Sequence, residues 1–213
     1  MIKRELYMNR IRPFIGGELI KVMTGIRRSG KSVMLELIKE ELAEAGVAPS
    51  QMISINFEDM RYSHLQTATA LHDEIIKRAE GIEGKAYLFF DEIQEVEGWE
   101  KCVNSLRVAL DCDIYITGSN AKLLSGELAT YIGGRYVEFV IYPFSFAEFL
   151  ELYHTIAPSD SIQQCFQKYL LAGGMPYLAN LRYEEEPSRQ YLTDLFNSVQ
   201  LKDIVKRNKI RDI

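Results

Sequence analysis

Residues 25–32 read Gly25-Ile26-Arg27-Arg28-Ser29-Gly30-Lys31-Ser32 and match the glycine-rich phosphate-binding pattern G-x-x-x-x-G-K-[ST]. A strand-like run from Leu19 to Met23 precedes this stretch, and a helical pattern of apolar residues follows it as far as Gly46. A loop that opens a helix directs backbone N–H groups toward an anion, so the context suits phosphate binding. The stretch therefore predicts a site for a nucleoside triphosphate.

Each fixed position of this loop has an expected role. The backbone N–H groups converge on the phosphates, while Lys31 supplies a positive charge to the β and γ groups. The Ser32 hydroxyl is a candidate ligand for Mg²⁺. An ordinary glycine turn is the alternative, but average residue usage makes a chance match roughly a one per cent event. The expected nucleotide-binding residues of the loop are Gly25, Arg28, Ser29, Gly30, Lys31 and Ser32.

An acidic strand end is expected farther along the chain, at Asp91-Glu92. The preceding run Ala86-Tyr87-Leu88-Phe89-Phe90 is continuously apolar, as in a parallel strand that is buried on both faces. In this pattern Asp91 holds Mg²⁺ directly or through water, and Glu92 orients and deprotonates the attacking water. A strand that simply ends in a solvated acidic turn is the alternative, and the pairing with the phosphate loop favours the catalytic interpretation.

A third apolar strand, Asp113 to Ile116, ends in the small polar run Thr117-Gly118-Ser119-Asn120. Open α/β sheets bind ligands at the carboxyl ends of their strands, so Ser119 or Asn120 is a candidate contact for the γ-phosphate or the attacking water. The same residue types suit an N-cap for a helix that begins near Ala121. On the sequence, both interpretations stay open.

In chain order, these three motifs resemble the Walker A, Walker B and sensor 1 motifs of the AAA+ ATPases. The chain also resembles a prokaryotic subfamily of largely uncharacterised ATPases, through its loop and through Gly133-Gly134-Arg135, Tyr142-Pro143-Phe144-Ser145-Phe146-Ala147-Glu148-Phe149 and Gly173-Gly174-Met175-Pro176. The resemblance extends over nearly the whole chain. It implies adenine as the base, ATP with Mg²⁺, and a further C-terminal domain of unsettled role after the AAA domain.

The resemblance also implies a role for Arg135, which matches an arginine that reaches the γ-phosphate of a neighbouring subunit in that family. Such a finger would require a homo-oligomer. The alternative is a surface arginine that pairs with one of the many carboxylates. A sensor 2 arginine is not found in the matching region, where the run from Gly173 to Pro176 is similar to a glycine-x-proline element that related signalling ATPases place near the nucleotide. A helix C-cap followed by a proline stop explains this run equally well.

The alternation of strand and helix patterns predicts a three-layer α/β sandwich with a parallel sheet. The expected strands are Ile20–Thr24, Met52–Phe57, Ala86–Phe90, Asp113–Thr117 and Tyr136–Ile141, and the expected helices lie around 31–46, 65–80, 99–110 and 121–131. The AAA+ resemblance implies the strand order 5-1-4-3-2, which spacing alone does not show. From Ser145 onward only helical patterns occur, so we expect an ATPase core over residues 1–144 and a lid-like helical subdomain over 145–213.

Composition fits a cytoplasmic enzyme: 213 residues with 47% hydrophobic and 26% charged residues, no apolar run long enough to span a bilayer, and an N-terminus without the apolar core of a secretory signal. Cys102, Cys112 and Cys165 have no paired CxxC spacing and are expected to be buried thiols. The net charge of −5 excludes a global basic footprint for nucleic acid. A local cluster remains at the C-terminus, either as a solvated helix end or as a DNA contact: Lys202, Lys206, Arg207, Lys209 and Arg211.

Three classes of function follow. The leading hypothesis is an ATPase in which Glu92 activates water and Arg135 completes the site in an oligomer, with Asn120 as a further candidate catalytic residue. The competing hypothesis is a nucleotide-gated switch that binds ATP or ADP and changes its contacts with a protein or nucleic-acid partner, with little or no hydrolysis. A small-molecule kinase is disfavoured, because the sequence lacks an arginine-rich lid and the carboxylate after Asp91 favours water as the acceptor.

Overall fold

The computed structural model describes residues 2–118 and 132–199. Its sheet contains five parallel strands in the order β2-β3-β4-β1-β5. The strands are β1 (Ile20–Thr24), β2 (Met52–Asn56), β3 (Ala86–Asp91), β4 (Cys112–Thr117) and β5 (Tyr136–Val140). This order confirms the one implied by the AAA+ resemblance. Because all five strands are parallel, their carboxyl ends lie along one edge of the sheet.

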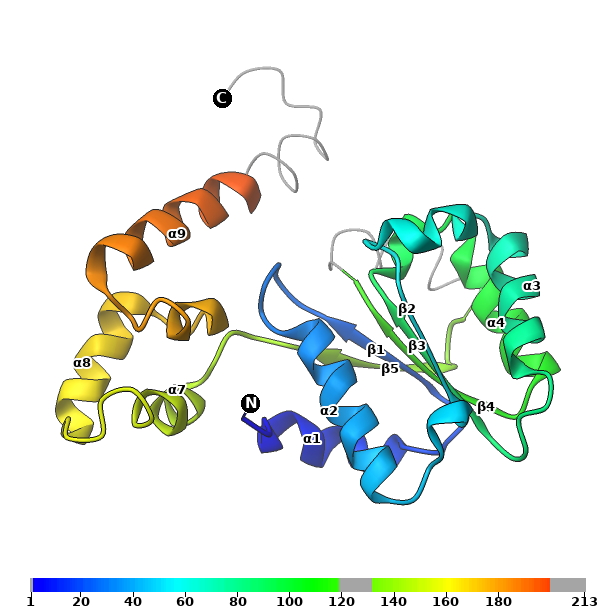
Figure 1. Cartoon of the computed structure of the whole chain (residues 1–213), viewed down its shortest axis with the longest axis horizontal. Helices are drawn as coiled ribbons and strands as arrows, with labels where there is room; N and C mark the ends of the chain where they lie inside the picture. The colour runs from blue at the N-terminus through cyan, green and yellow to red at the C-terminus, as the bar shows by residue number, and fades with distance from the viewer. Residues whose placement is uncertain (1, 119–131, 200–213) are drawn as a thin grey trace. The chain divides into compact units, whose positions relative to one another are not determined.

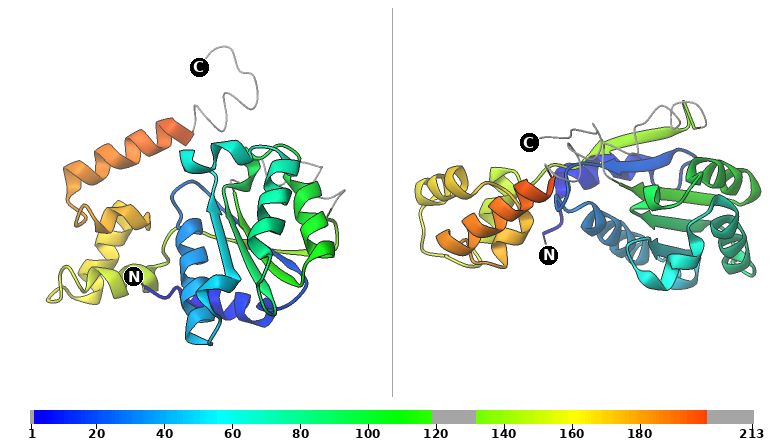
Figure 2. Two further views of the ribbon diagram at one scale, coloured as in Figure 1. Left: turned by 45° about the vertical axis from the view of Figure 1, so that its right-hand side comes forward. Right: turned by 90° about the horizontal axis from the view of Figure 1, so that it is seen from above.

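Helices cover both faces of the sheet, which confirms the three-layer fold. The helices α1 (Glu5–Ile11) and α2 (Lys31–Glu44) lie against one face. The helices α3 (Ala68–Ala79) and α4 (Trp99–Ala109) lie against the other (Figure 1), and the left panel of Figure 2 shows α2 and the α3–α4 pair on opposite sides. Short 3₁₀ turns connect the elements: Arg12–Phe14, Pro49–Gln51, Met60–Leu65, Ile93–Glu95 (η4) and Pro176–Ala179.

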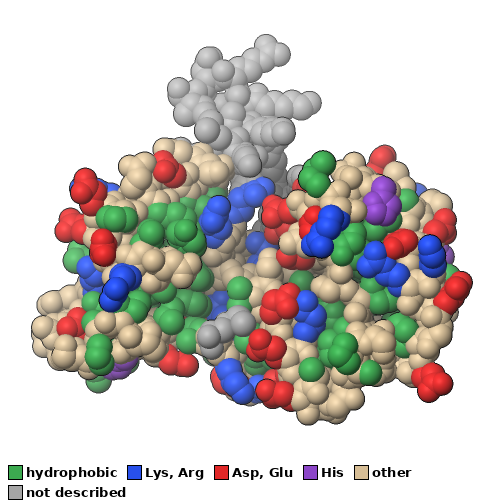
Figure 3. Space-filling model, viewed as in Figure 1, with side chains coloured by type: hydrophobic (Ala, Val, Ile, Leu, Met, Phe, Trp, Pro, Cys, Tyr) green, Lys and Arg blue, Asp and Glu red, His purple; other side chains and the backbone are tan. Residues whose placement is uncertain are grey.

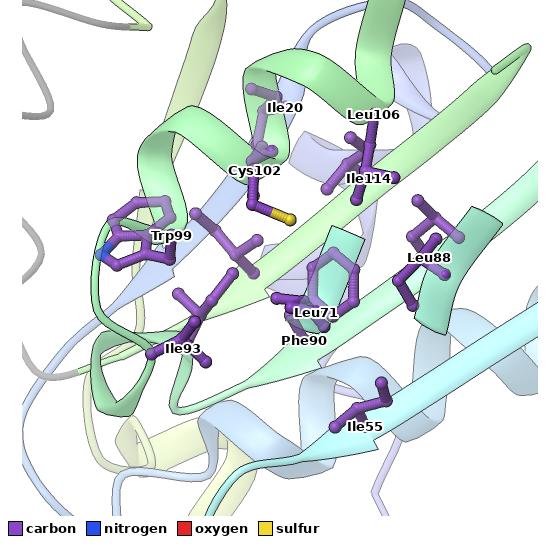
Figure 4. Packing of buried hydrophobic residues seen from close by; sticks show 14 of the residues in the cluster. Ile20, Ile55, Leu71, Leu88, Phe90, Ile93, Trp99, Cys102, Leu106 and Ile114 are labelled. Atoms are coloured by element: carbon purple, nitrogen blue, oxygen red, sulfur yellow. The ribbon is translucent and has the colours of Figure 1, made fainter. Parts of the chain in front are cut away.

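The apolar run of β3 explains why this strand sits inside the sheet. Leu88 and Phe90 are fully buried in the cluster formed with α3 and α4. Phe89 faces the opposite layer, where its ring stacks on that of Tyr115 with 4.8 Å between the centroids. Successive residues of a strand point to opposite faces, so a strand covered on both sides has to be apolar throughout. Figure 4 shows the cluster on the α3–α4 side, which includes Ile93 and Trp99.

A buried ion pair joins β1 and β4 near their amino ends. The Lys21 ammonium donates to the Asp113 carboxylate, and both side chains are fully buried. Asp113 also accepts hydrogen bonds from the Tyr115 hydroxyl at 2.7 Å and from the backbone N–H of Gly16 at 2.6 Å. Burial lowers the pKa of Lys21, while the adjacent Asp113 acts to raise it. The cluster lies at the edge opposite the carboxyl ends of the strands, so it is structural with respect to the predicted site.

The chain divides into two compact units. The sheet unit contains Lys3–Ile26 and Lys31–Ile141, and the helical unit contains Ile2, Arg27–Gly30 and the chain from Tyr142 onward. In the helical unit, α7 (Phe146–Tyr153) and α8 (Ile162–Ala172) each begin with a capping box, and α9 (Glu185–Val199) follows. No helix among residues 2–118 and 132–199 is long and apolar enough to cross a membrane.

The helical unit has its own aromatic core. The Phe149 ring contacts the rings of Phe146, Tyr153, Tyr169 and Tyr183, with centroids 4.9 to 6.3 Å apart. Hydrophobic side chains also reach the surface of this unit (Figure 3). Leu171 and Phe196 are the exposed ones that line a groove of about 520 Å³ formed by α8 and α9.

Gly173 ends α8, and Gly174 pairs with the backbone of Phe144. Gly173 is the C-cap residue with φ at 75°, and its N–H donates to the Tyr169 carbonyl at 2.8 Å. The Gly174 carbonyl accepts from the Phe144 N–H at 2.7 Å. Pro176 then begins a 3₁₀ turn. This geometry agrees with the interpretation of the Gly173-to-Pro176 run as a helix C-cap followed by a proline stop.

Candidate functional site

The loop of residues 25–30 connects β1 to α2, and Lys31 is the first residue of α2. Three of its residues have positive φ: Gly25 at 142°, Arg28 at 62° and Gly30 at 99°. Glycine adopts such angles without the Cβ penalty, which explains why the two fixed glycines stand at these positions. Ser32 is exposed in the first turn of α2, and Ser29 is buried. The loop thus leads directly into the N-terminus of α2, as the sequence predicts.

The Lys31 side chain is buried and points back over its own loop. Its Nζ atom lies 3.3 Å from the carbonyl oxygens of Gly25 and Ile26. The same atom lies 3.7 Å from the Glu92 Oε1 atom. The structure therefore brings together the loop lysine and the acidic end of β3, two sites that are far apart in the sequence.

Asp91 is the last residue of β3 and is buried. The Thr117 hydroxyl donates to its Oδ1 atom, and the Thr117 oxygen accepts from the backbone N–H of Glu92 at 3.0 Å. One threonine thus holds both members of the acidic pair. Thr117 ends the adjacent strand β4, and the register that places Phe90 beside Ile116 sets Asp91 next to it.

Thr117 contacts both candidate site residues Asp91 and Glu92, and the sequence did not predict this role for it. A feature of the sequence could have indicated this role. Thr117 carries a hydroxyl at the carboxyl end of β4, and the implied strand order 5-1-4-3-2 places β4 beside β3. The prediction selected Ser119 and Asn120 from the same run instead. Ser119 and Asn120 lie outside the described residues, as does the basic cluster from Lys202 to Arg211. Their predicted roles stay predictions.

Glu92 has φ at 56°, in the left-handed region, and precedes the 3₁₀ turn η4. The side chain is 16% exposed. Gln94, two residues later, donates from Nε2 to the Glu92 Oε2 atom. The two oxygens of the Glu92 carboxylate therefore face two different groups, the ammonium of Lys31 and the amide of Gln94. Gln94 is the second residue that the sequence reasoning did not select.

Arg135 stands away from these residues. It directly precedes β5, and its guanidinium donates to the Asn104 Oδ1 atom of α4 at 2.9 Å. Its backbone carbonyl accepts from the N–H of Ile20, the first residue of β1. Arg135 thus lies at the amino edge of the sheet, whereas the loop follows the carboxyl end of β1. Its side-chain partner in the structure is an amide and not the carboxylate considered from the sequence.

The donor set suits a magnesium ion. Asp91 offers carboxylate oxygens, and the exposed residue Ser32 offers a hydroxyl. Mg²⁺ prefers such oxygen ligands together with water and phosphate. The Asp91 carboxylate already accepts one hydrogen bond from Thr117, and its second oxygen has no hydrogen bond among the described residues. The residues present therefore fit the ion that the motif pattern implies.

A family model described as an AAA domain matches residues 18–150. The chain belongs to this AAA family. The matched range begins just before β1 and ends inside α7, so it contains the loop, the Asp91–Glu92 pair and all five strands of the AAA protein.

Two curated relatives cover most or all of the chain. An uncharacterized protein of Haemophilus influenzae is 41% identical over 213 residues, which are 100% of this chain and 52% of the relative. An uncharacterized protein of Methanocaldococcus jannaschii is 34% identical over 203 residues, which are 91% of this chain and 44% of the relative. The chain therefore spans about half the length of the curated relatives it matches.

Solved structures share the fold. AMPPCP-bound DnaA of Aquifex aeolicus has a TM-score of 0.54 at 14% identity, over 97% of this chain and 66% of that chain. A P216G mutant of RuvB from Thermotoga maritima has a TM-score of 0.51 at 15% identity, over 95% of this chain and 69% of that chain. These similarities confirm the AAA+ P-loop fold, a fold of nucleotide-binding proteins.

Proposed function

We propose that this AAA protein binds ATP with Mg²⁺ and hydrolyses it to ADP and phosphate. The observation that carries the proposal is the 3.7 Å separation of Lys31 Nζ and Glu92 Oε1 at the carboxyl edge of the sheet. It places a phosphate-binding cation beside an acidic pair in which one carboxylate is buried and the other is partly exposed. The partly exposed second carboxylate, Glu92, supports hydrolysis because a carboxylate beside the phosphate-binding cation is suited to accept a proton from water.

The residues have distinct proposed roles. Backbone N–H groups of the loop, including those of Gly25, Arg28, Ser29 and Gly30, bind the phosphates, and Lys31 binds the β- and γ-phosphate oxygens. Ser32 and Asp91 would hold Mg²⁺, which would neutralise charge on the phosphates when bound. Glu92 accepts a proton from the attacking water. Thr117 fixes the orientation of both carboxylate residues through its two hydrogen bonds.

We further propose that Arg135 acts on the nucleotide of a neighbouring subunit. Within one subunit it stands beside Ile20, four residues before the end of β1. At roughly 3.3 Å per residue, this separates it from the loop by about 13 Å along the strand alone, which is beyond the reach of its side chain to the phosphates. A catalytic role for Arg135 therefore requires an oligomer.

Phosphate release from MgATP, measured over a series of protein concentrations, tests the proposal. We expect specific activity to rise with concentration, to be lost in Lys31→Ala and Arg135→Ala, and to persist in the exposed control Arg10→Ala. Constant specific activity from nanomolar to high micromolar protein would contradict the oligomeric site. Tight binding with negligible turnover at every concentration would instead identify a nucleotide-gated switch that depends on a partner.

A further inference from the structure

The turn after Glu92 places a second polar side chain against the catalytic carboxylate. Gln94 Nε2 donates to Glu92 Oε2, although the two residues are only two positions apart. The left-handed backbone of Glu92 and the 3₁₀ turn η4 that follows it make this contact possible. An extended strand would also put residues i and i+2 on one face, but η4 folds them closer together.

The turn is fixed by its own hydrogen bonds and by the core. The Glu95 N–H donates to the Glu92 carbonyl at 3.2 Å, and the Val96 N–H donates to the Ile93 carbonyl at 3.0 Å. Ile93 is fully buried in the cluster shown in Figure 4. The relative placement of Glu92 and Gln94 is therefore built into the sheet unit.

The amide of Gln94 has a defined orientation. With Nε2 toward Glu92, a donor faces an acceptor, whereas the flipped amide would place Oε1 against a carboxylate oxygen, with two acceptors opposed. This orientation leaves Oε1 buried, and it has no hydrogen-bond partner among residues 2–118 and 132–199. A buried acceptor without a donor costs about 1–3 kcal/mol, and Oε1 therefore has an acceptor capacity that none of the described residues uses.

We propose that Gln94 Oε1 is the second hydrogen-bond acceptor for the attacking water, with Glu92 as the first. This inference rests on the proposed ATPase function and names a further residue of the same site. A water has two O–H donors, and a pair of acceptors that binds both of them leaves its lone pair directed at the phosphorus. Gln94 also holds the Glu92 carboxylate through Nε2, so a single amide orients both the base and the water.

The chemical step balances with these groups alone. The water oxygen forms a bond to the γ-phosphorus, and the bond between that phosphorus and the β–γ bridging oxygen breaks, with its electron pair going to ADP. One water proton passes to the Glu92 carboxylate and then to solvent. The other O–H stays with the phosphate product and donates to Gln94 during the attack.

The test compares two glutamines by the same substitution. Gln94→Met keeps the side-chain length and removes both hydrogen-bonding atoms. Gln51→Met is the matched control, because the Gln51 amide is also partly buried but donates to the Lys85 carbonyl at 3.0 Å, at the amino end of β3. Measurements are kcat, the Kd of a fluorescent ATP analogue, and the thermal midpoint.

We expect Gln94→Met to lower kcat by about 10²-fold with the Kd and the thermal midpoint unchanged. Gln51→Met should lower the thermal midpoint and leave kcat unchanged. Wild-type kcat in Gln94→Met, together with an inactive Glu92→Gln, would overturn the role of Gln94 while the ATPase proposal stands. A parallel loss of kcat, affinity and stability in Gln94→Met would show that Gln94 has only a structural role and would overturn this inference. Absence of turnover in the wild-type protein would overturn the ATPase proposal and this inference with it.

Discussion

The Lys31 Nζ atom lies 3.7 Å from the Glu92 Oε1 atom, and both side chains are largely buried. The ammonium is also 3.3 Å from two carbonyl oxygens of its own loop. A phosphate that binds Lys31 therefore shares this cation with the carboxylate that is proposed to activate water. The two residues are coupled, so a change in the charge of one should alter what the other does.

Replacing Glu92 by glutamine should separate binding from hydrolysis. The variant keeps the shape of the side chain but removes the negative charge that competes with phosphate for Lys31. We expect ATP affinity to be no weaker than in the wild type and kcat to fall by at least about 10²-fold, because the general base is lost. Titration with a fluorescent ATP analogue and phosphate release measure the two quantities. The exposed Glu97→Gln is the control, and full turnover in Glu92→Gln would remove Glu92 from the catalytic role.

Replacing Lys31 by alanine should weaken nucleotide binding itself. Hydrogen bonds to a charged group contribute about 1.5–3 kcal/mol, so the Kd for ATP should rise roughly 10- to 100-fold. Isothermal titration calorimetry gives this Kd directly. Lys77→Ala, which removes an exposed lysine from α3, should bind ATP like the wild type. If Lys31→Ala retained wild-type affinity, the loop would not be the phosphate site.

Thr117 should matter for both stability and turnover. In Thr117→Val the shape is kept, but Asp91 loses a donor and the Glu92 N–H loses its acceptor. Leaving such buried groups unsatisfied costs about 1–3 kcal/mol, which a urea unfolding midpoint measures. We expect kcat to fall as well, because the two carboxylate residues lose their common anchor. Thr117→Ser keeps the hydroxyl and should recover both quantities; failure to do so would point to packing of the methyl group instead.

The sequence predicted those parts of the candidate site that depend on local pattern. Lys31, Asp91 and Glu92 stand in motifs that fix strand, turn and helix together, and the structure brings all three to one edge of the sheet. Thr117 and Gln94 depend on other information. The first reaches Asp91 through the register between β4 and β3, and the second reaches Glu92 through a left-handed residue and a 3₁₀ turn. The alternating pattern of a strand predicts neither the register between two strands nor a left-handed residue followed by a 3₁₀ turn.

The sequence did not predict the side-chain partner of Arg135 for a related reason. Its guanidinium donates to Asn104 because the chain returns to the amino edge of the sheet next to α4. Carboxylates outnumber basic groups in the composition, which favoured an acidic partner for Arg135. Composition, however, does not say where in the fold a residue lies. The same limit applies to Lys21 and Asp113, whose burial as a pair follows from β1 lying beside β4.

Gly174 should tolerate no side chain. A Cβ atom at this position would lie 2.0 Å from the Phe144 carbonyl oxygen, and the Gly174 carbonyl is itself bound to the Phe144 N–H. Because both sides of this contact are backbone, Gly174→Ala should destabilise the helical unit by more than the roughly 1–2 kcal/mol that a left-handed residue costs. Gly46→Ala is the control, with φ at 92° and open space around its Cβ position. Equal losses of thermal stability in the two variants would show that the backbone near Phe144 adapts.

Stability should fall in alkaline solution because two thiols are buried in the sheet unit. Burial raises the pKa of Cys102 from 9.0 to about 12 and that of Cys112 from 9.0 to about 11. Above pH 9 the unfolded chain releases these protons while the folded chain keeps them, so the unfolded state binds fewer protons and the free energy of unfolding decreases as pH rises. The stabilising contribution is complete below pH 9 and is lost on the way to pH 11–12.

Urea unfolding midpoints at pH 8, 9.5 and 10.5 test this linkage. Each thiol contributes a slope of up to about 1.4 kcal/mol per pH unit in that range. Cys102→Ala lowers stability at every pH through its cavity, but it removes one titrating group, so its stability should decline less steeply with pH than that of the wild type. An identical pH dependence in the two proteins would mean that the buried thiol of Cys102 is not what destabilises the fold in alkali.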